Sequence, residues 1–384
     1  MLISSRVFSG RIKLMAKIQK QESAIFLIVI GVAILFRMYG LDTLPPIFEN
    51  KLLSLRVFSA LIGILTIIGT YLLTKEMFNW KLASIASYLM AISFWHVNLS
   101  RTENIAIMIP FLMVYTFFFL WRGIKTNNFY NFVMAGIFGG LACLPTGRDL
   151  VFTPFTLTPF IVVAVFVNYW WYLKKDFGYS KYEHTKTKLL QGFVIFFLIA
   201  LVVSLPSLIS MWQNQQGLYL GTFSFSNFIK TFGMFNFSGD LNPKQNIPNS
   251  PIFSWPIGIF FIIGFINEFT HWLKRKHGHF STTHTLLFVW FFTMLIPGFL
   301  SSNSPDSFLT VGALPVVMIF TAQGIKWFFE KLSLWYKIND RHSIHLPAQT
   351  GESHAITTLV MILFLFSIGF MEYWRYFKVW VVSQ

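Results

Sequence analysis

Residues 24–73 decide the fold, and they read AIFLIVIGVAILFRMYGLDTLPPIFENKLLSLRVFSALIGILTIIGTYLL. Two long apolar runs, 24–41 and 53–73, flank a short polar segment that carries two carboxylates, Asp42 and Glu49. Each run is long enough to cross about 30 Å of hydrocarbon as a helix. The stretch therefore predicts a helical hairpin in a membrane, with a carboxylate-bearing loop at its end.

Similar apolar runs recur along the whole chain, which is 55% hydrophobic and only 12% charged. A soluble domain of this size does not need so much apolar surface. Continuous apolar runs exclude an alternating β-barrel, so the spans must be helices. We predict an all-α, polytopic integral membrane protein with about 11 transmembrane helices, at residues 24–41, 53–73, 82–98, 104–121, 130–146, 151–171, 189–211, 252–271, 284–300, 308–325 and 355–372.

The net charge of +15 predicts the orientation rather than a nucleic-acid partner. With the N-terminus in the cytoplasm, 21 of the 30 Lys and Arg residues fall in cytoplasmic segments. Cytoplasmic loops of membrane proteins collect basic residues in this way. We therefore predict a multi-pass protein of the plasma membrane with a cytoplasmic N-terminus and an extracytoplasmic C-terminus.

The predicted spans form a single transmembrane domain over residues 1–384. A basic cytoplasmic segment, 1–23, precedes the first span. A long, aromatic and nearly uncharged extracytoplasmic loop covers 212–251, and a basic cytoplasmic loop covers 326–354. Loops of such length are usually functional or disordered, and the aromatic content of 212–251 argues against disorder.

Three segments on the predicted outer face carry ionisable residues that plain span ends do not need. They are SFWHVNLSRTENIAIMIP, PTGRDL and FNFSGDLNPKQNIPNSPIFSW, with His96, Arg101, Glu103, Arg148, Asp240 and Lys244. Ionisable groups at the membrane boundary are costly unless they are paired or hydrated, so they are candidates for function. The alternative is structural: Arg101 reaches the interface with Glu103 as its partner, and Arg148 forms a local ion pair with Asp149.

These segments resemble glycosyltransferase family 39, the protein O-mannosyltransferase-like membrane enzymes of bacteria with the GT-C fold. The phrase WHVNLSRTENIA followed by FFFLWRG is similar to the family's WHxxxSRxGxRA and LWRG. GDLNPKQNIPNSP resembles its GDxNPRHNxPG, and SPDSFLTVGALP its PHxLRxxGALP. LDTLPP after the first span and YWRYFKVW near the end also match. The matches follow one order along most of the chain.

The resemblance implies transfer of a sugar from a polyprenyl-phosphate carrier to a glycan, lipid or protein acceptor on the extracytoplasmic face. Such chemistry needs a carboxylate to deprotonate the acceptor and cations to hold the leaving phosphate. It implies no metal or other cofactor, and it implies contact with membrane lipids. By position, the resemblance makes Glu49 the catalytic base, with Asp42 as the second candidate. It places Arg101, Arg148 and Lys244 on the donor phosphate. His96, Glu103 and Asp240 would support these residues.

The sequence also departs from the family pattern. Most of the outer segment that follows LPP in relatives is absent, so Glu49 is the nearest counterpart of their Asp-Glu pair. Ile105 and Leu309 stand where the family has arginines. Two interpretations follow: a working transferase with a shortened loop, or a catalytically degenerate member that has lost its site.

Two rivals come from other classes. A lipid or solute transporter would suit many spans and a polar outer cavity, but interrupted spans in corresponding halves and internal repeats, its usual sequence signs, do not stand out. A structural scaffold would tolerate substitution of Arg101, Arg148 and Glu49.

Overall fold

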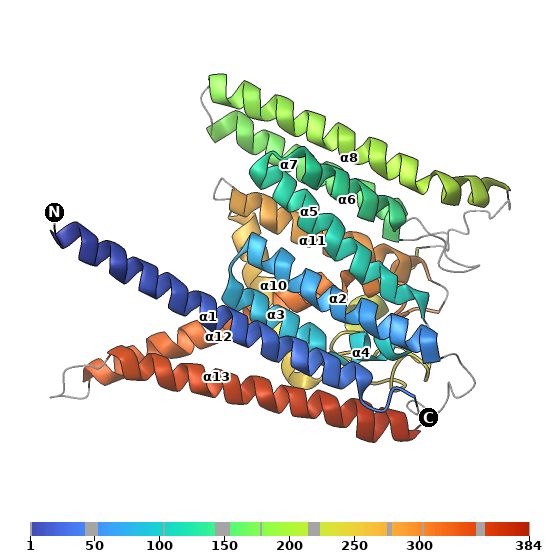
Figure 1. Cartoon of the computed structure of the whole chain (residues 1–384). Helices are drawn as coiled ribbons and strands as arrows, with labels where there is room; N and C mark the ends of the chain where they lie inside the picture. Colours follow the sequence, from blue (N-terminus) through green and yellow to red (C-terminus); the bar gives the residue numbers. More distant parts are fainter. Residues whose placement is uncertain are drawn as a thin grey trace.

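The computed structural model describes residues 2–42, 53–102, 104–142, 154–176, 179–213, 223–274, 279–301, 303–342 and 350–383. Within these ranges the protein is helical and contains no strand, which confirms the all-α class. The helices run roughly along one direction in a single bundle (Figure 1). They are α1 (Leu2–Met38), α2 (Leu53–Met77), α3 (Trp80–Ile92), α4 (Phe94–Arg101), η2 (Ile105–Ile107), α5 (Met108–Thr126), α6 (Phe129–Leu141), α7 (Pro154–Asp176), α8 (Tyr179–Gln213), α9 (Phe225–Gly233), α10 (Trp255–Leu273), α11 (His279–Leu300), η3 (Val311–Ala313), α12 (Leu314–His342), α13 (Thr350–Tyr373), the π-helix η4 (Trp374–Trp380) and η5 (Val381–Ser383).

Among the described residues, eight helices are long and apolar enough to cross a membrane. A ninth span results if α3 and α4, which meet at an angle of 57°, cross together. Two shorter apolar helices, Phe129–Leu141 and Leu157–Trp171, coincide with two further predicted spans. The polytopic membrane class is therefore confirmed, while the count of eleven stays a prediction.

Three segments predicted to lie outside the spans contain helical structure. The basic segment 1–23 is continuous with the first span, since α1 begins at Leu2. Residues 326–342, expected in a cytoplasmic loop, extend the preceding span as the second half of α12. The long segment 212–251 contains the short helix α9, whose residues Phe228 and Phe232 pack on the apolar core.

The centre of the bundle is α12, whose first half is buried on all sides. Its neighbour α10 approaches so closely that backbone meets backbone at Gly264 and Gly324. A Cβ atom on Gly264 would lie 1.7 Å from the carbonyl oxygen of Phe320, and one on Gly324 would lie 2.0 Å from that of Phe260. Small residues permit such close contacts between membrane helices. By contrast, α8 and α13 lie at the two edges in Figure 1 and expose large apolar side chains, as expected for surfaces that face lipid.

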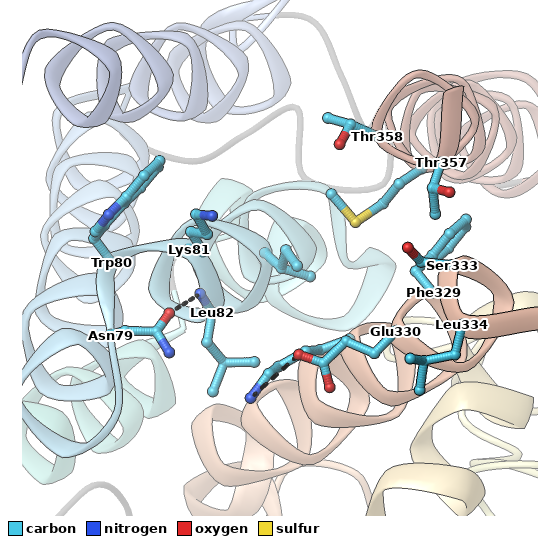
Figure 2. Close-up of a pocket in the computed structure, with 13 residues that line it drawn as sticks. Asn79, Trp80, Lys81, Leu82, Phe329, Glu330, Ser333, Leu334, Thr357 and Thr358 are labelled. Carbon is cyan, nitrogen blue, oxygen red and sulfur yellow. Dashed lines mark hydrogen bonds and ion pairs between the residues drawn. The ribbon is translucent and has the colours of Figure 1, made fainter. Parts of the chain in front are cut away.

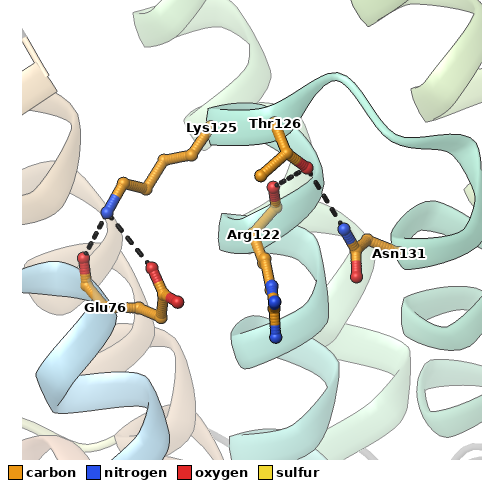
Figure 3. Close-up of polar contacts among 5 residues, drawn as sticks. All are labelled: Glu76, Arg122, Lys125, Thr126 and Asn131. Carbon is orange, nitrogen blue, oxygen red and sulfur yellow. Dashed lines mark hydrogen bonds and ion pairs between the residues drawn. The ribbon is translucent and has the colours of Figure 1, made fainter.

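The two ends of the bundle differ in chemistry. At one end, ion pairs and caps join the end of α2, the end of α5 and the start of α6 (Figure 3). Lys125 donates to the carboxylate of Glu76 at 3.2 Å and to its carbonyl oxygen at 2.9 Å, and Asn131 donates to Thr126 at 3.2 Å. The opposite end holds α4 and the end of α13, and the candidate site lies there.

Candidate functional site around α4

Helix α4 begins with a sharp break in the third span. Ser93 has φ −54° and ψ 122°, which ends α3, and its N–H still bonds to the carbonyl of Leu89. The N–H of Phe94, the first residue of the new helix, donates to the carboxylate of Glu372 at 3.0 Å. A carboxylate at a helix N-terminus satisfies such a donor and stabilises the helix dipole. The last part of α13 therefore fixes the start of α4.

Arg101, the last residue of α4, closes onto the C-terminus of α1. It is fully buried, and its guanidinium donates to the carbonyl oxygens of Phe36, Arg37 and Gly40 at 3.2, 3.0 and 3.1 Å. Terminal carbonyls of a helix favour a cation at this position. The rings of Tyr376 and Phe377 lie 5.7 and 5.1 Å from the guanidinium carbon, in cation–π contact. The arginine thus joins α4, α1 and η4.

Arg56 of α2 holds the turn that follows α1. Its Nε donates to the carbonyl oxygen of Arg101 at 3.1 Å, and Nη1 donates to that of Asp42 at 3.4 Å. Asp42 is the last described residue before 43–52, and it is exposed. The contacts therefore fix the main chain at the start of the segment in which the catalytic carboxylates were predicted.

Another buried arginine, Arg37 of α1, contacts His96. The guanidinium nitrogen Nη2 lies 2.5 Å from Nδ1 of His96, and Nη1 donates to the carbonyl oxygens of Ala33 and Ala91 at 3.1 and 3.0 Å. Gly63 permits this packing, since a Cβ there would lie 3.0 Å from Nε of Arg37. His96 was predicted to support Arg101, but its recorded contact is with Arg37.

The long loop meets α4 through Asn98. The side-chain amide of Asn98 donates to the carbonyl oxygens of Lys244 and Gln245 at 3.1 and 3.0 Å. The Lys244 side chain itself is exposed at this end of the bundle. The GDLNPKQN phrase is therefore placed directly beside the WHVNLSR phrase, about 140 residues earlier in the chain.

Asp240 joins that loop to the segment before α12. One oxygen of its buried carboxylate accepts from the N–H of Asn242 at 2.8 Å, and the other accepts from the N–H and the hydroxyl of Ser307, both at 2.9 Å.

Next to Ser307, Asp306 accepts from the N–H groups of Phe308 and Leu309 at 2.9 and 3.1 Å. Burial raises the pKa of Asp306, and the nearby charge of Asp240 raises it further, against the lowering effect of the two N–H donors.

The aromatic phrase YWRYFKVW also contacts the segments around α4. Trp380 donates its indole N–H to the carbonyl oxygen of Pro243 at 2.9 Å. Arg375 donates to the carbonyls of Pro251 and Ile252, and its guanidinium lies 4.7 Å from the ring centre of Phe94. Five phrases that are distant in sequence thus meet around α4: the turn after the first span, WHVNLSR, GDLNPKQNIPNSP, SPDSF and YWRYFKVW.

The structure brings together five of the eight predicted site residues: Asp42, His96, Arg101, Asp240 and Lys244. The other three, Glu49, Glu103 and Arg148, lie outside the described residues. Sequence reasoning did not select Arg37, Arg56, Asn98, Ser307 or Glu372. Arg37 and Glu372 carried a usable signal, because each is a charge inside a predicted span or at its last residue. Asn98 and Ser307 carried none, since only the folded chain shows their partners.

Comparison with known proteins identifies the class. Residues 39–179 match the family model described as dolichyl-phosphate-mannose-protein mannosyltransferase, a range that includes α4 and the start of the predicted catalytic loop. Among solved structures, the oligosaccharyltransferase of Archaeoglobus fulgidus in its apo form matches with a TM-score of 0.51 and 13% identity, over 91% of this chain and 56% of that chain. ArnT from Cupriavidus metallidurans bound to undecaprenyl phosphate matches with a TM-score of 0.45 and 14% identity, over 91% and 63%. No curated protein matches the chain by sequence.

The chain is a polytopic membrane protein with a fold similar to that of the archaeal oligosaccharyltransferase, and the resemblance predicted from the sequence is confirmed over residues 39–179. Over residues 39–179 it is similar to the dolichyl-phosphate-mannose-protein mannosyltransferase family. It spans little more than half the length of the oligosaccharyltransferase that it matches.

Proposed function

We propose that this protein transfers a sugar from a polyprenyl-phosphate carrier to an acceptor on the extracytoplasmic face. The observation that carries the proposal is the meeting of five family-like phrases around α4. A chain that kept only the fold would not need Asn98, Arg101 and Asp240 to bind three separate loop segments. The family model, named for a polyprenyl-type donor, supports the same reaction class.

The acceptor hydroxyl requires a base, and the segment after Leu41 supplies it. Glu49 is the proposed base, and Asp42 is the alternative. Arg56 and Arg101 fix the main chain where this segment begins, which limits where a carboxylate six or seven residues further on can lie. Such limits matter because a displacement of roughly 1 Å can cost about 100-fold in rate.

The donor phosphate requires cations at the surface of the site. Lys244 is exposed beside α4 and is the proposed contact, with Arg148 from the loop before α7. Arg101 was predicted for the same role, but its guanidinium is buried against three carbonyl oxygens. Direct binding of phosphate would require those hydrogen bonds to open. We therefore assign Arg101 to positioning, together with Asp240, which holds Ser307.

The test is transfer of a radiolabelled sugar from a polyprenyl-phosphate donor pool by membranes that contain the protein. Glu49→Gln and Asp42→Asn each remove one carboxylate without changing its size. Glu76→Gln, at the opposite end of the bundle, is the matched control. We expect Glu49→Gln to lower transfer by about 100-fold or more, Asp42→Asn to have a smaller effect and Glu76→Gln to leave it unchanged.

Two results would contradict the proposal in different ways. Donor binding without transfer by the unaltered protein, across mannosyl, glucosyl and aminosugar donors, would establish a degenerate family member. Donor that moves across the membrane without loss of its sugar would establish a transporter.

A further inference from the structure

A cavity of about 740 Å³ lies at the end of the bundle opposite the candidate site. Its walls come from the start of α3, the second half of α12 and the start of α13. Figure 2 shows Trp80 and Lys81 on one side of this space, with Ser333, Thr357 and Thr358 on the other. None of these residues takes part in the proposed sugar transfer, so the cavity needs an explanation of its own.

The lining has two chemical zones. The polar zone contains two ammonium groups and one carboxylate, together with an amide and three hydroxyls; these belong to Lys81, Lys326, Glu330, Asn79, Ser333, Thr357 and Thr358. The apolar zone is formed by Leu82, Ile85, Phe329, Leu334 and Met361. A ligand that fits both zones has an anionic head and an apolar body.

The cavity lies at the depth of lipid headgroups. Trp80 is the first residue of α3, and Thr357 and Thr358 are the second and third residues of the candidate span Ile356–Ser383. Lys326 and Ser333 lie among the last ten residues of the candidate span Val311–Trp335. Three spans therefore end around the same space, where a bilayer changes from hydrocarbon to headgroup.

The charge of this zone suits an anion. Lys326 lies 4.0 Å from the carboxylate of Glu330, and both side chains are well exposed, which makes a weak ion pair that a stronger anion can replace. The ammonium group of Lys81 lies 5.8 Å from the ring centre of Trp80, and the Lys81 residue is exposed. Basic pockets between membrane helices on the cytoplasmic side recognise anionic lipid headgroups.

We propose that this cavity binds one anionic phospholipid of the leaflet opposite the sugar-transfer site. Lys81 and Lys326 hold its phosphate, and an acyl chain packs along Phe329 and Met361. The site is independent of the proposed transferase reaction. A free phosphate would use the polar zone alone and would leave the apolar wall without a partner.

Native mass spectrometry of the full chain in detergent tests the proposal by titration with phosphatidylglycerol and with phosphatidylcholine of the same acyl composition. The double variant Lys81→Gln/Lys326→Gln removes both ammonium groups. The control Lys125→Gln/Lys331→Gln removes the same charge from the same end, outside the cavity lining. We expect phosphatidylglycerol to bind the double variant about 30-fold more weakly than the unaltered protein, on the basis of roughly 1 kcal/mol for each lysine. The control is expected to change affinity less than threefold.

A second variant separates shape from charge. Met361→Phe keeps both lysines and narrows the apolar wall, so phosphatidylglycerol binding should fall several-fold although the charge is unchanged. This variant also decides the matter if the double-lysine variant aggregates.

Three results would overturn the proposal. Equal losses in the double variant and its control would show general attraction to a basic surface. Equal binding of the two lipids would exclude recognition of the anionic head. Competition by glycerol phosphate or inorganic phosphate as effective as that by the lipid would show a phosphate site without a place for the acyl chain.

Discussion

Asp240 and Ser307 lie 67 residues apart in sequence and are joined by two hydrogen bonds of 2.9 Å to the same carboxylate oxygen. One comes from the main chain of Ser307 and the other from its hydroxyl. The carboxylate is buried, so the pair acts as a fixed joint between the long loop and the segment that leads into α12.

Asp240→Ala is expected to release this joint. Loss of the carboxylate leaves the N–H of Ser307 without its acceptor in a buried place, at a cost of about 1–3 kcal/mol. Limited proteolysis should then cut the region around residues 236–250 faster, and sugar transfer should fall at least tenfold. Ser307→Ala removes only the hydroxyl and should have a smaller effect. The double variant Asp240→Ala/Ser307→Ala tests whether the two residues act as a pair. If its loss of stability equals the sum of the losses of the two single variants, they do not.

Arg101→Lys is expected to lower the thermal midpoint of the protein in detergent. A lysine keeps the charge, but its single nitrogen replaces the two guanidinium nitrogens that bond these three carbonyl oxygens, and hydrogen bonds to charged groups contribute about 1.5–3 kcal/mol each. Because we assign Arg101 to positioning, kcat should fall while the donor KM changes little. A variant with an unchanged midpoint and a donor KM raised tenfold would instead make Arg101 a phosphate ligand.

The raised pKa of Asp306 predicts how stability depends on pH. Its ordinary value is 3.8, and burial together with Asp240 holds the folded-state pKa above it. The folded protein therefore binds this proton more tightly than the unfolded chain does, and the stability that the proton contributes is lost as the pH rises through the folded-state pKa. Asp306→Asn should flatten this part of the stability profile. It should also leave the protein at neutral pH as stable as the unaltered form, or more so, in thermal melts between pH 4 and 7.

Gly264→Ala is expected to separate α10 from α12. Its Cβ would lie 1.7 Å from a main-chain oxygen, which no side-chain rotation can relieve. Overpacking of this kind costs roughly 1–3 kcal/mol or more, so folded yield in detergent should fall sharply. Gly31→Ala in α1 is the matched control, since nothing lies within 4 Å of the added atom. There the better helix propensity of alanine should leave the yield equal or higher.

The sequence predicted the class because the class depends on local signals. Apolar runs identify spans directly, and the GDLNPKQN and WHVNLSR phrases are recognisable in the sequence without a structure. The break at Ser93 was not predicted, because the apolar run continues through it and Glu372, whose carboxylate accepts from the N–H of Phe94, lies 278 residues away. For the same reason the buried position of Arg101 was not predicted. From the sequence alone, an arginine at the end of a span could equally bind the donor phosphate or cap a helix. Its three carbonyl partners, which only the structure shows, decide between these roles.

The bond between Glu372 and Phe94 has a consequence for the order in which this protein is assembled. Spans enter a membrane as they are synthesised, and α4 leaves the ribosome long before the end of α13 does. Until that last segment arrives, the first donor of α4 lacks its acceptor, and Arg101 lacks the aromatic faces of Tyr376 and Phe377. The region around α4 is therefore completed only when the end of α13 has been made, although α4 itself ends at Arg101. A nascent chain arrested before residue 370 would carry most of its spans and an unfinished site.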